Sequence, residues 1–225
     1  MINSNKSENI FRTKETIFIY EFLNFLEIFI HLLLYLRGVY PKEAFFPHKE
    51  YNLNFLKYIP DKVISSYITD FINSLETLLK EKCIHSVFVM IINDNSNEII
   101  ELFTIDIDIN EFYFTNNSDE EYYYEICNCL KSILHHFYYK YINMTPFSIN
   151  IDKENRTFNL CIETIKEGKI INGVNNYNDI SHTIKNSYIH NLIIDNFMKI
   201  NSKNKEEDVV MEEENFCIKI NHISI

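Results

Sequence analysis

The segment from Ile17 to Leu36 constrains the fold more than any other part of the chain, because it is apolar over a length that could cross a bilayer. Only Glu21, Asn24, Glu27 and His31 interrupt it. These residues recur every three to four positions and so form one stripe on a helix, and two carboxylates would be costly in lipid. We therefore predict a buried central helix of a globular protein, with the stripe forming one hydrated or satisfied edge and His31 as a hydrogen-bonded core histidine.

The remaining pattern predicts an α+β layout in which helices pack on a mostly antiparallel sheet. Gly38 and then Pro41 punctuate the end of the first helix, and Ser118 can cap the third. Residues 1–12 are polar and irregular, and we expect a disordered tail there. The other predicted elements are a helix from Pro60 to about Leu79, a hairpin of 85–92 with 99–109, a helix from Ser118 to Tyr141, a hairpin of 147–151 with 157–164, and a last strand over 216–225.

Side-chain placement can be predicted for two of these regions. The loop after the first helix carries more aromatic mass than a solvated connection needs, so it should fold back over a helix; its aromatic residues are Phe45, Phe46, Tyr51 and Phe55. On the helix after Ser118, the apolar side should include Tyr123 and Ile126, and the exposed side should carry Lys131 and His135.

Charge and cysteine usage exclude several classes of protein. The formal net charge is -11, which argues against a chain that grips phosphate backbones, because that requires clustered Lys and Arg. We therefore expect no direct nucleic-acid contact. The five cysteines are odd in number and form no CxxC pair, so we expect reduced thiols, no disulfide framework and no zinc site. The start of the chain shows no secretory leader pattern, and we expect neither secretion nor a membrane anchor.

The motifs that usually mark catalysis are missing from the sequence. Three glycines in the whole chain could scarcely build a phosphate-cradling loop, and no GxxxxGK[ST], GxGxxG, HExxH or GxSxG occurs. His135 and His136 are neighbours on a helix and point in different directions, as do Cys127 and Cys129. The acidic stretch over 206–214 favours a solvated loop. We expect a non-enzyme without cofactor or metal; the alternative is a hydrolase or metalloenzyme of unrecognised geometry.

The end of the first helix carries the motif of a known family. Residues 34–41 read LYLRGVYP, and a Tyr-Asn pair follows about ten residues later as Tyr51-Asn52. Together with the helix that runs from Glu21 to His31, these residues resemble the HORMA-domain family, and within it the accessory subunits of DNA polymerase zeta, whose pattern is LYxRxVYP. The later predicted elements follow in the family's order, so the resemblance covers roughly Thr16 to Ile225.

The resemblance implies a HORMA fold, with three helices on a mostly antiparallel sheet and a C-terminal safety belt that wraps across a bound peptide. Residues 13–225 would form this domain, with 13–164 as its core and 165–225 as the belt and last strand. The residue pattern agrees, because about fifty weakly patterned residues before a strand would be uncommon as an ordinary loop. Such a belt adds main-chain hydrogen bonds to an extended ligand and releases it only through local unfolding.

By the same resemblance, peptide contacts would fall on Tyr40 and Tyr67, to which we add Phe71 one helical turn later. Core packing is the alternative reading of each. The family has a Trp in the belt, but this chain has no Trp. The segment that stands in its place is Tyr188, Ile189 and His190. Lys131 takes the place of an Arg on the family's dimer face, and Gly38 replaces its acidic partner, which makes dimerisation through that face less secure.

The function implied is that of a peptide-clamping adaptor of polymerase zeta in the nucleus. Its partners would be the catalytic subunit, through a Pro-containing peptide, and other translesion-synthesis factors. A HORMA homo- or heterodimer and an AAA+ ATPase remodeller are further expectations. The alternative is a HORMA protein of spindle-checkpoint or meiotic chromosome-axis signalling, which shares the fold but clamps other peptides.

Overall fold

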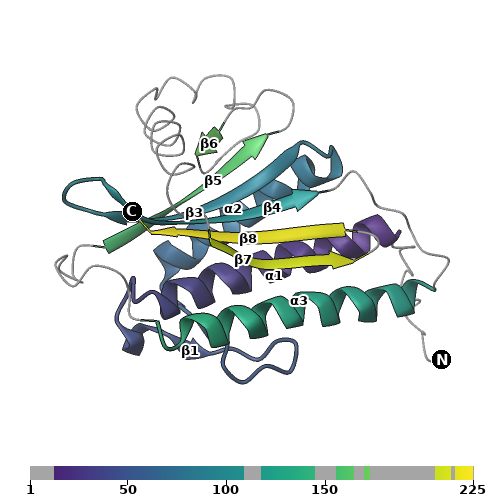
Figure 1. The fold of residues 1–225 in the computed structure, drawn as a ribbon, viewed down its shortest axis with the longest axis horizontal. Helices are drawn as coiled ribbons and strands as arrows, with labels where there is room; N and C mark the ends of the chain where they lie inside the picture. The colour runs from purple at the N-terminus through teal and green to yellow at the C-terminus, as the bar shows by residue number, and fades with distance from the viewer. Residues whose placement is uncertain are drawn as a thin grey trace, which may run out of the picture.

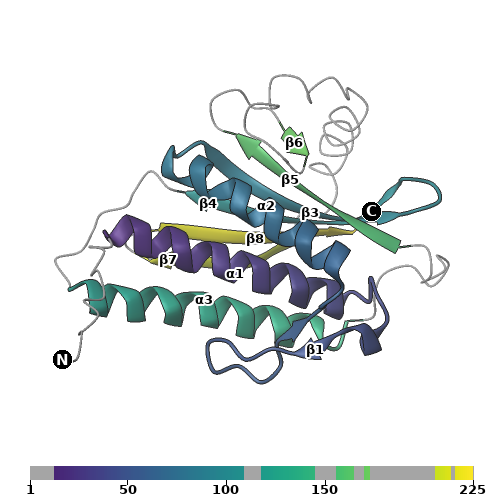
Figure 2. The same cartoon turned by 180° about the vertical axis from the view of Figure 1, so that it is seen from behind.

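A six-stranded antiparallel sheet with three helices on one face forms the body of the protein (Figures 1 and 2). The computed structural model describes residues 13–108, 118–144, 156–164, 170–172, 206–213 and 216–224. The strand order is β6-β5-β3-β4-β8-β7. The helices are α1 (Lys14–Leu36), α2 (Lys62–Lys80) and α3 (Asp119–Tyr141). The strands of the sheet are β3 (Ile84–Asn93), β4 (Ile99–Asp108), β5 (Arg156–Thr164), β6 (Ile170–Asn172), β7 (Glu206–Glu213) and β8 (Phe216–Ser224).

The central helix α1 is the buried helix that its sequence predicts. It is long and apolar enough to span a bilayer, yet 78% of its most apolar window is buried inside the protein, between α2, α3 and the sheet. Its end is a Schellman motif, in which Val39 N–H donates to the Leu34 carbonyl and Gly38 N–H donates to the Tyr35 carbonyl. Gly38 supplies the positive φ of 61° that this motif requires.

Each residue of the polar stripe of α1 has a hydrogen-bond partner from another segment, although the Nε2 atom of His31 has none among the described residues. The stripe therefore joins elements far apart in the sequence, because a buried polar group without a partner would be costly. His31 is the hydrogen-bonded core histidine that we predicted. The pairs are Cys127 Sγ with Glu21 Oε2 (3.7 Å), Asn24 Nδ2 with Tyr51 Oη (3.5 Å), Thr69 Oγ1 with Glu27 Oε1 (2.9 Å), and Ile59 N–H with His31 Nδ1 (3.5 Å).

The aromatic loop after α1 folds back over the helices, as expected. Tyr51 and Asn52 both have positive φ, and Leu53 N–H donates to the Glu50 carbonyl, so the Tyr-Asn pair forms a type I′ turn. Phe55 stacks on Tyr138 of α3 with ring centroids 4.1 Å apart. Phe46 departs from the expectation, because it is 58% exposed in the short strand β1 (Phe46–Pro47), which pairs with β2 (Lys57–Tyr58).

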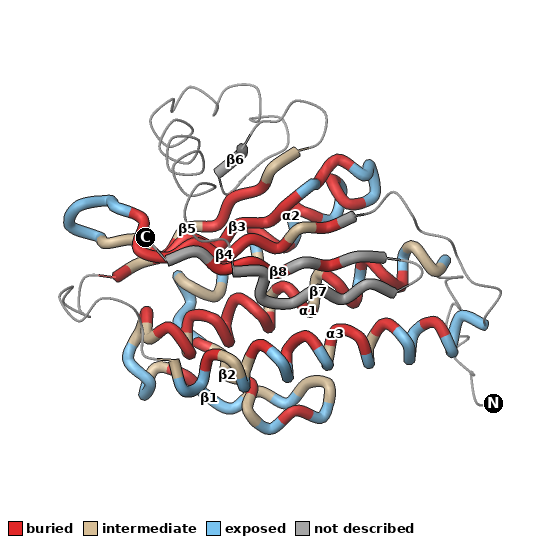
Figure 3. The backbone as a smooth tube through the Cα atoms, viewed as in Figure 1, coloured by how far each residue is buried: buried red, intermediate tan, exposed pale blue. Residues whose placement is uncertain are grey.

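The third helix begins where predicted but turns a different face to the core. Ser118 and Glu121 form a capping box at its start. Tyr122 is 2% exposed, whereas Tyr123, which we expected on the apolar side, is 42% exposed. The buried positions run through Tyr122, Ile126, Cys129, Ile133, Phe137 and Tyr141, a three-to-four spacing that Tyr123 does not fit. Figure 3 shows this alternation of buried and exposed residues along α3. His135 is exposed, as predicted.

The sheet confirms the hairpin of β3 with β4, the strand over β5 and the C-terminal strand β8. The acidic stretch that we expected to be a solvated loop is instead the edge strand β7. Its central Val209-Val210-Met211 has high strand propensity, and charged residues are common on edge strands because they discourage unwanted pairing. The predicted strand over 147–151 and the expected tail over 1–12 lie outside the described residues.

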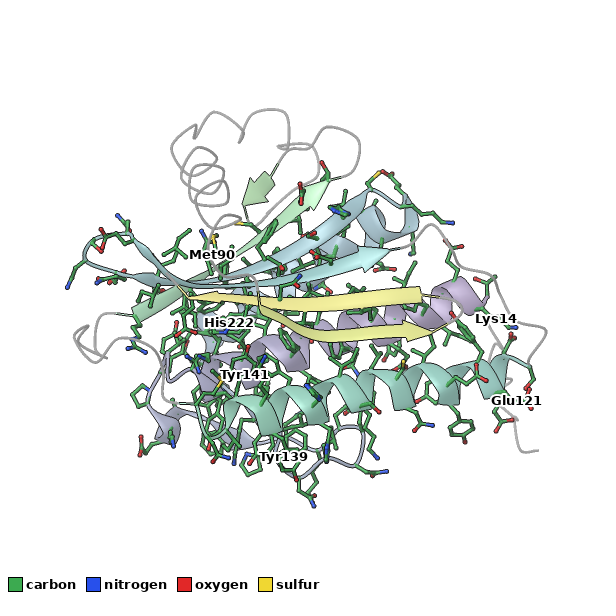
Figure 4. All side chains as sticks on the ribbon, in the orientation of Figure 1. Lys14, Met90, Glu121, Tyr139, Tyr141 and His222 are labelled. Atoms are coloured by element: carbon green, nitrogen blue, oxygen red, sulfur yellow. The ribbon has the colours of Figure 1, made fainter. Side chains whose placement is uncertain are left out.

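A buried ion pair lies where the end of α1 meets the sheet. Arg37 Nε lies 2.7 Å from Glu101 Oε2 and Arg37 Nη2 lies 2.9 Å from Glu101 Oε1, in bidentate geometry, and both residues are fully buried. His222 Nε2 of β8 is 3.5 Å from Glu101 Oε2, and Arg156 Nη1 of β5 donates to the Arg37 carbonyl. Figure 4 shows His222 and Tyr141 between β8 and the end of α3, and the Arg37 guanidinium lies over the Tyr141 ring.

These neighbours keep Glu101 ionised. Burial alone would raise the pKa of the Glu101 carboxyl, but His222 and then Arg37 outweigh it and hold the pKa below the ordinary value. Since the folded-state pKa is lowered, this contribution to stability is present above the ordinary Glu pKa and is lost as pH falls through the lowered one. The pair therefore joins α1, β4 and β8 most firmly near neutral pH.

Substituting Glu101→Gln should lower the free energy of unfolding by about 3–5 kcal/mol, because the Arg37 charge would remain buried without its counter-charge. Urea denaturation followed by circular dichroism measures this. The matched control is Glu98→Gln, an exposed glutamate beside the turn of the same hairpin, which should change stability by less than about 0.5 kcal/mol. Equal effects of the two substitutions would contradict the role assigned to the pair.

His31 should make the protein acid-sensitive. Burial, with a smaller effect of His48, lowers the pKa of His31 from 6.5 to about 4. Between these values the unfolded chain binds a proton on His31 that the folded chain does not, so the free energy of unfolding should fall by about 3 kcal/mol from pH 7 to pH 4. Denaturation at a series of pH values should show a shallower decline for His31→Gln and an unchanged one for the exposed His135→Gln. Identical slopes for wild type and His31→Gln would refute this assignment.

Candidate functional site

The outer edge of β5 is one part of the sheet that can accept another strand. On its inner side β5 pairs with β3 along its whole length. On its outer side β6 pairs only with Cys161, Ile162 and Glu163. Among the described residues, no strand pairs with the outer edge of residues 156–160. An extended segment could therefore add there by main-chain hydrogen bonds.

Aromatic side chains from three elements meet beside this edge. The Tyr40 ring, just after α1, lies edge-on to the Phe158 ring of β5 at 6.3 Å, and the Tyr67 ring of α2 lies edge-on to the same ring at 5.6 Å. Both tyrosines are half-buried and so keep exposed surface, while Phe158 is buried between them. The structure thus brings together the two tyrosines that the sequence singled out, and does so through Phe158.

The Tyr67 hydroxyl reaches the main chain of the edge itself. It donates to Asn159 Oδ1 at 2.9 Å and accepts from Leu160 N–H at 3.2 Å, and the same N–H also lies 2.9 Å from Asn159 Oδ1. Burial raises the pKa of Tyr67, and the hydrogen bond from Leu160 only partly offsets this, so the phenol stays protonated and able to donate. Burial likewise raises the pKa of Tyr40, against a smaller lowering by a hydrogen bond with Thr157.

The other residues predicted to form sites are placed differently. Phe71 is 2% exposed and packs in the core. Tyr188, Ile189 and His190 lie outside the described residues. Gly38 sits in the Schellman motif at the end of α1, and Lys131 lies in the middle of α3. The ligand-binding and dimer-interface roles stay predictions.

Two residues of this edge were not singled out from the sequence. Phe158 forms the centre of the aromatic cluster, and Asn159 links the Tyr67 hydroxyl to the strand. The alternation of residues 157–162 indicated a strand with one apolar face, but nothing in the sequence placed it next to α2. The contact of Tyr67 with Asn159 spans 92 positions, so it depends on the tertiary fold.

The C-terminal strands lie at the opposite side of the sheet. β8 pairs with β4, and β7 forms the edge beyond it. Residues 173–205 therefore connect β6, at one edge, with β7, at the other.

No group of three or more metal-binding side chains occurs within the described ranges. There, Cys83, Cys127, Cys129 and Cys161 are free thiols, in agreement with the expectation of reduced cysteines. The side chain of Cys217 is not among those described. The features that the described residues offer at this edge are thus strand-pairing groups and aromatic surface.

Comparison with known proteins identifies relatives over part of the chain. The family model described as HORMA domain matches residues 22–123, a little under half of the chain. Mitotic spindle assembly checkpoint protein MAD2B from Rattus norvegicus is 33% identical over 83 residues, which cover 37% of this chain and 38% of the relative. The MAD2B protein of Homo sapiens matches with the same identity and coverage. The chain therefore aligns with well under half the length of these curated relatives.

Solved structures extend the similarity to nearly the whole chain. A chain in the crystal structure of the mitotic checkpoint complex superposes with a TM-score of 0.64 at 15% identity, covering 92% of this chain and 98% of that one. C. elegans HTP-2 bound to the HIM-3 closure motif superposes with a TM-score of 0.61 at 10% identity, covering 95% of this chain and 92% of the other. At such identities the likeness shows the fold.

Replacing the ring that joins Tyr40 to Tyr67 should loosen the site. Phe158→Ala removes a buried aromatic side chain and should lower the free energy of unfolding by about 3 kcal/mol. Urea denaturation measures the loss, and Phe46→Ala, at an exposed position of β1, is the control that should cost little. A Phe158→Ala effect no larger than the control's would show that the cluster does not hold β5 against α2.

Proposed function

We propose that this chain, which has the HORMA fold, is a peptide-clamping adaptor subunit of the translesion DNA polymerase zeta complex. In this role it binds an extended, Pro-containing peptide of the polymerase catalytic subunit and bridges that subunit to other DNA-damage-tolerance factors. It acts by binding and not by catalysis. The observation that carries the proposal is the outer edge of residues 157–160 of β5, which no described strand covers and which Tyr40 and Tyr67 flank.

The main chain of β5 supplies the attachment. Alternate residues of a strand direct their N–H and C=O groups to opposite sides, and Leu160 N–H points away from β3, toward Tyr67. Phe158 shares that orientation, so its main-chain groups also face the outer edge, which no described strand covers at this position. A ligand strand that pairs with them would receive its affinity from main-chain hydrogen bonds and its specificity from side chains in contact with Tyr40 and Tyr67.

The belt is the second part of the proposal. Residues 165–205 would pass over the ligand strand, with β7 and β8 fixing the far end on the opposite edge of the sheet. The pairing of β8 with β4 and the burial of His222 beside Glu101 support this, because they anchor the C-terminal end of the belt in the core. Release would then require local unfolding, which makes dissociation slow.

The choice of polymerase zeta rests on the resemblance carried by the LYLRGVYP motif with Tyr51-Asn52. A second candidate is an adaptor of spindle-checkpoint or meiotic-axis signalling. It is favoured by the structural neighbours from the mitotic checkpoint complex and from HTP-2 with its closure motif. Both candidates use the β5 edge and differ in the peptide that they clamp.

Further parts of the proposal concern where the protein works and with what. A polymerase subunit would act in the nucleus and contact DNA only through its partners, in keeping with the net charge of -11. A HORMA homo- or heterodimer through Lys131 and Gly38 and an AAA+ ATPase that remodels the belt are proposed as additional partners.

A labelled Pro-containing peptide of the polymerase zeta catalytic subunit should bind the purified protein, as measured by fluorescence anisotropy. Combining Tyr40→Ala with Tyr67→Ala should weaken binding at least about tenfold, because both rings beside the edge are lost. Tyr124→Ala, at an exposed site on α3, should leave binding unchanged. A peptide N-methylated at alternate main-chain nitrogens should fail to bind, since it cannot donate to the edge.

The outcome selects between the candidates. Tighter binding of a spindle-checkpoint or meiotic closure-motif peptide would favour the second candidate. The adaptor proposal would be contradicted if the polymerase zeta, spindle-checkpoint and meiotic peptides all failed to bind. It would also be contradicted if the Tyr40→Ala, Tyr67→Ala double variant, with its fold verified by circular dichroism, bound as tightly as wild type.

A further inference from the structure

The edge of β5 is blocked at one position by side chains of the protein itself. Leu160 N–H points sideways from the outer edge of β5, to the place where the carbonyl of a neighbouring strand would accept its hydrogen bond. The oxygens that accept it here are Tyr67 Oη at 3.2 Å and Asn159 Oδ1 at 2.9 Å. A side chain from α2 and one from β5 thus occupy the place of a strand carbonyl.

The two side chains also hold each other in place. The Tyr67 hydroxyl donates to Asn159 Oδ1 at 2.9 Å, so hydroxyl, carboxamide and main-chain N–H form a closed set of hydrogen bonds. The Tyr67 ring is held separately, by its edge-on contact with Phe158. The Tyr67 hydroxyl therefore blocks strand pairing at Leu160, whereas the Tyr67 ring contributes packing against Phe158.

The block lies at a boundary along the strand. Beyond it, β6 pairs with Cys161, Ile162 and Glu163, and before it no described strand pairs with the outer edge of 157–158. Unpaired strand edges invite pairing with other chains, and proteins commonly protect them. The hydrogen bonds to Leu160 N–H therefore lie between the residues of β5 that β6 covers and the residues that no described strand covers.

We infer that Tyr67 and Asn159 form a removable plug on the β5 edge, which a ligand strand must displace before it can pair across Leu160. The inference rests on the proposed peptide binding at this edge and adds a specificity-determining device to it. In the absence of ligand, the plug supplies the hydrogen-bond acceptors for Leu160 N–H. It also opposes pairing by any strand whose other contacts with the protein are too few to compensate for the loss of these hydrogen bonds. A true ligand compensates for the lost hydrogen bonds with contacts along 156–158 and with the tyrosine rings.

The plug predicts opposite effects for two substitutions at one residue. Tyr67→Ala removes the ring as well as the hydroxyl and should weaken ligand binding. Tyr67→Phe keeps the ring against Phe158 but removes the hydroxyl, so a ligand no longer has to displace it and should bind several-fold, up to about tenfold, tighter. If the hydroxyl were instead a direct ligand contact, Tyr67→Phe would weaken binding.

The test uses the full chain and two readouts. Hydrogen exchange followed by NMR on the ligand-free protein should show faster exchange of the Leu160 amide in Tyr67→Phe and in Asn159→Ala than in wild type, with Tyr124→Phe as the control. Anisotropy with a short peptide selected on the wild-type protein from a phage-displayed random library should show tighter binding to Tyr67→Phe.

The results separate the plug from the proposed function. Unchanged Leu160 exchange in Tyr67→Phe, or equal or weaker peptide binding by that variant, would overturn the plug. Failure to select any peptide that wild type binds would overturn the proposed function, and the exchange rates alone would then decide whether the plug exists.

Discussion

The buried pair of Arg37 and Glu101 is the interaction on which the rest of the structure depends. Arg37 caps the end of α1, and Glu101 lies in β4 at the centre of the sheet, so their contact fixes the helix layer against the strand layer. His222 brings the C-terminal strand to the same point, and Arg156 brings β5. A charge buried this deeply is costly without its partner, so the arrangement is favourable only when all these segments are in place.

The Arg37–Glu101 pair also positions the residues of the candidate site. Tyr40 follows Arg37 by three residues, and Phe158 follows Arg156 by two, so the hydrogen bond between Arg156 and the Arg37 carbonyl lies next to the contact between the Tyr40 and Phe158 rings. The anchor of the core and the aromatic side of the β5 edge are therefore neighbours. The buried ion pair therefore holds the inner side of β5 in place, beside the outer edge that we propose to bind a ligand.

The same edge has two requirements that conflict. In the proposed function it has to accept a chosen strand and refuse others, because an uncovered strand edge is a general site for association. Aromatic surface beside the edge favours a ligand that covers it, and the hydrogen bonds of Tyr67 and Asn159 disfavour one that offers only a main chain. In the proposed function, selectivity would thus come from a balance between attraction to the aromatic surface and displacement of the Tyr67 and Asn159 hydrogen bonds.

The sequence by itself determined the elements and their buried faces, because local periodicity and capping act over a few residues. It predicted α1 with its polar stripe, the glycine at the helix end, the β3–β4 hairpin and the cap at Ser118, but it misplaced Tyr123 by one position and did not foresee β7. Only the tertiary structure decided which distant residues meet. Glu101 with Arg37, and Asn159 with Tyr67, are 64 and 92 positions apart, and no local pattern encodes a partner at that separation.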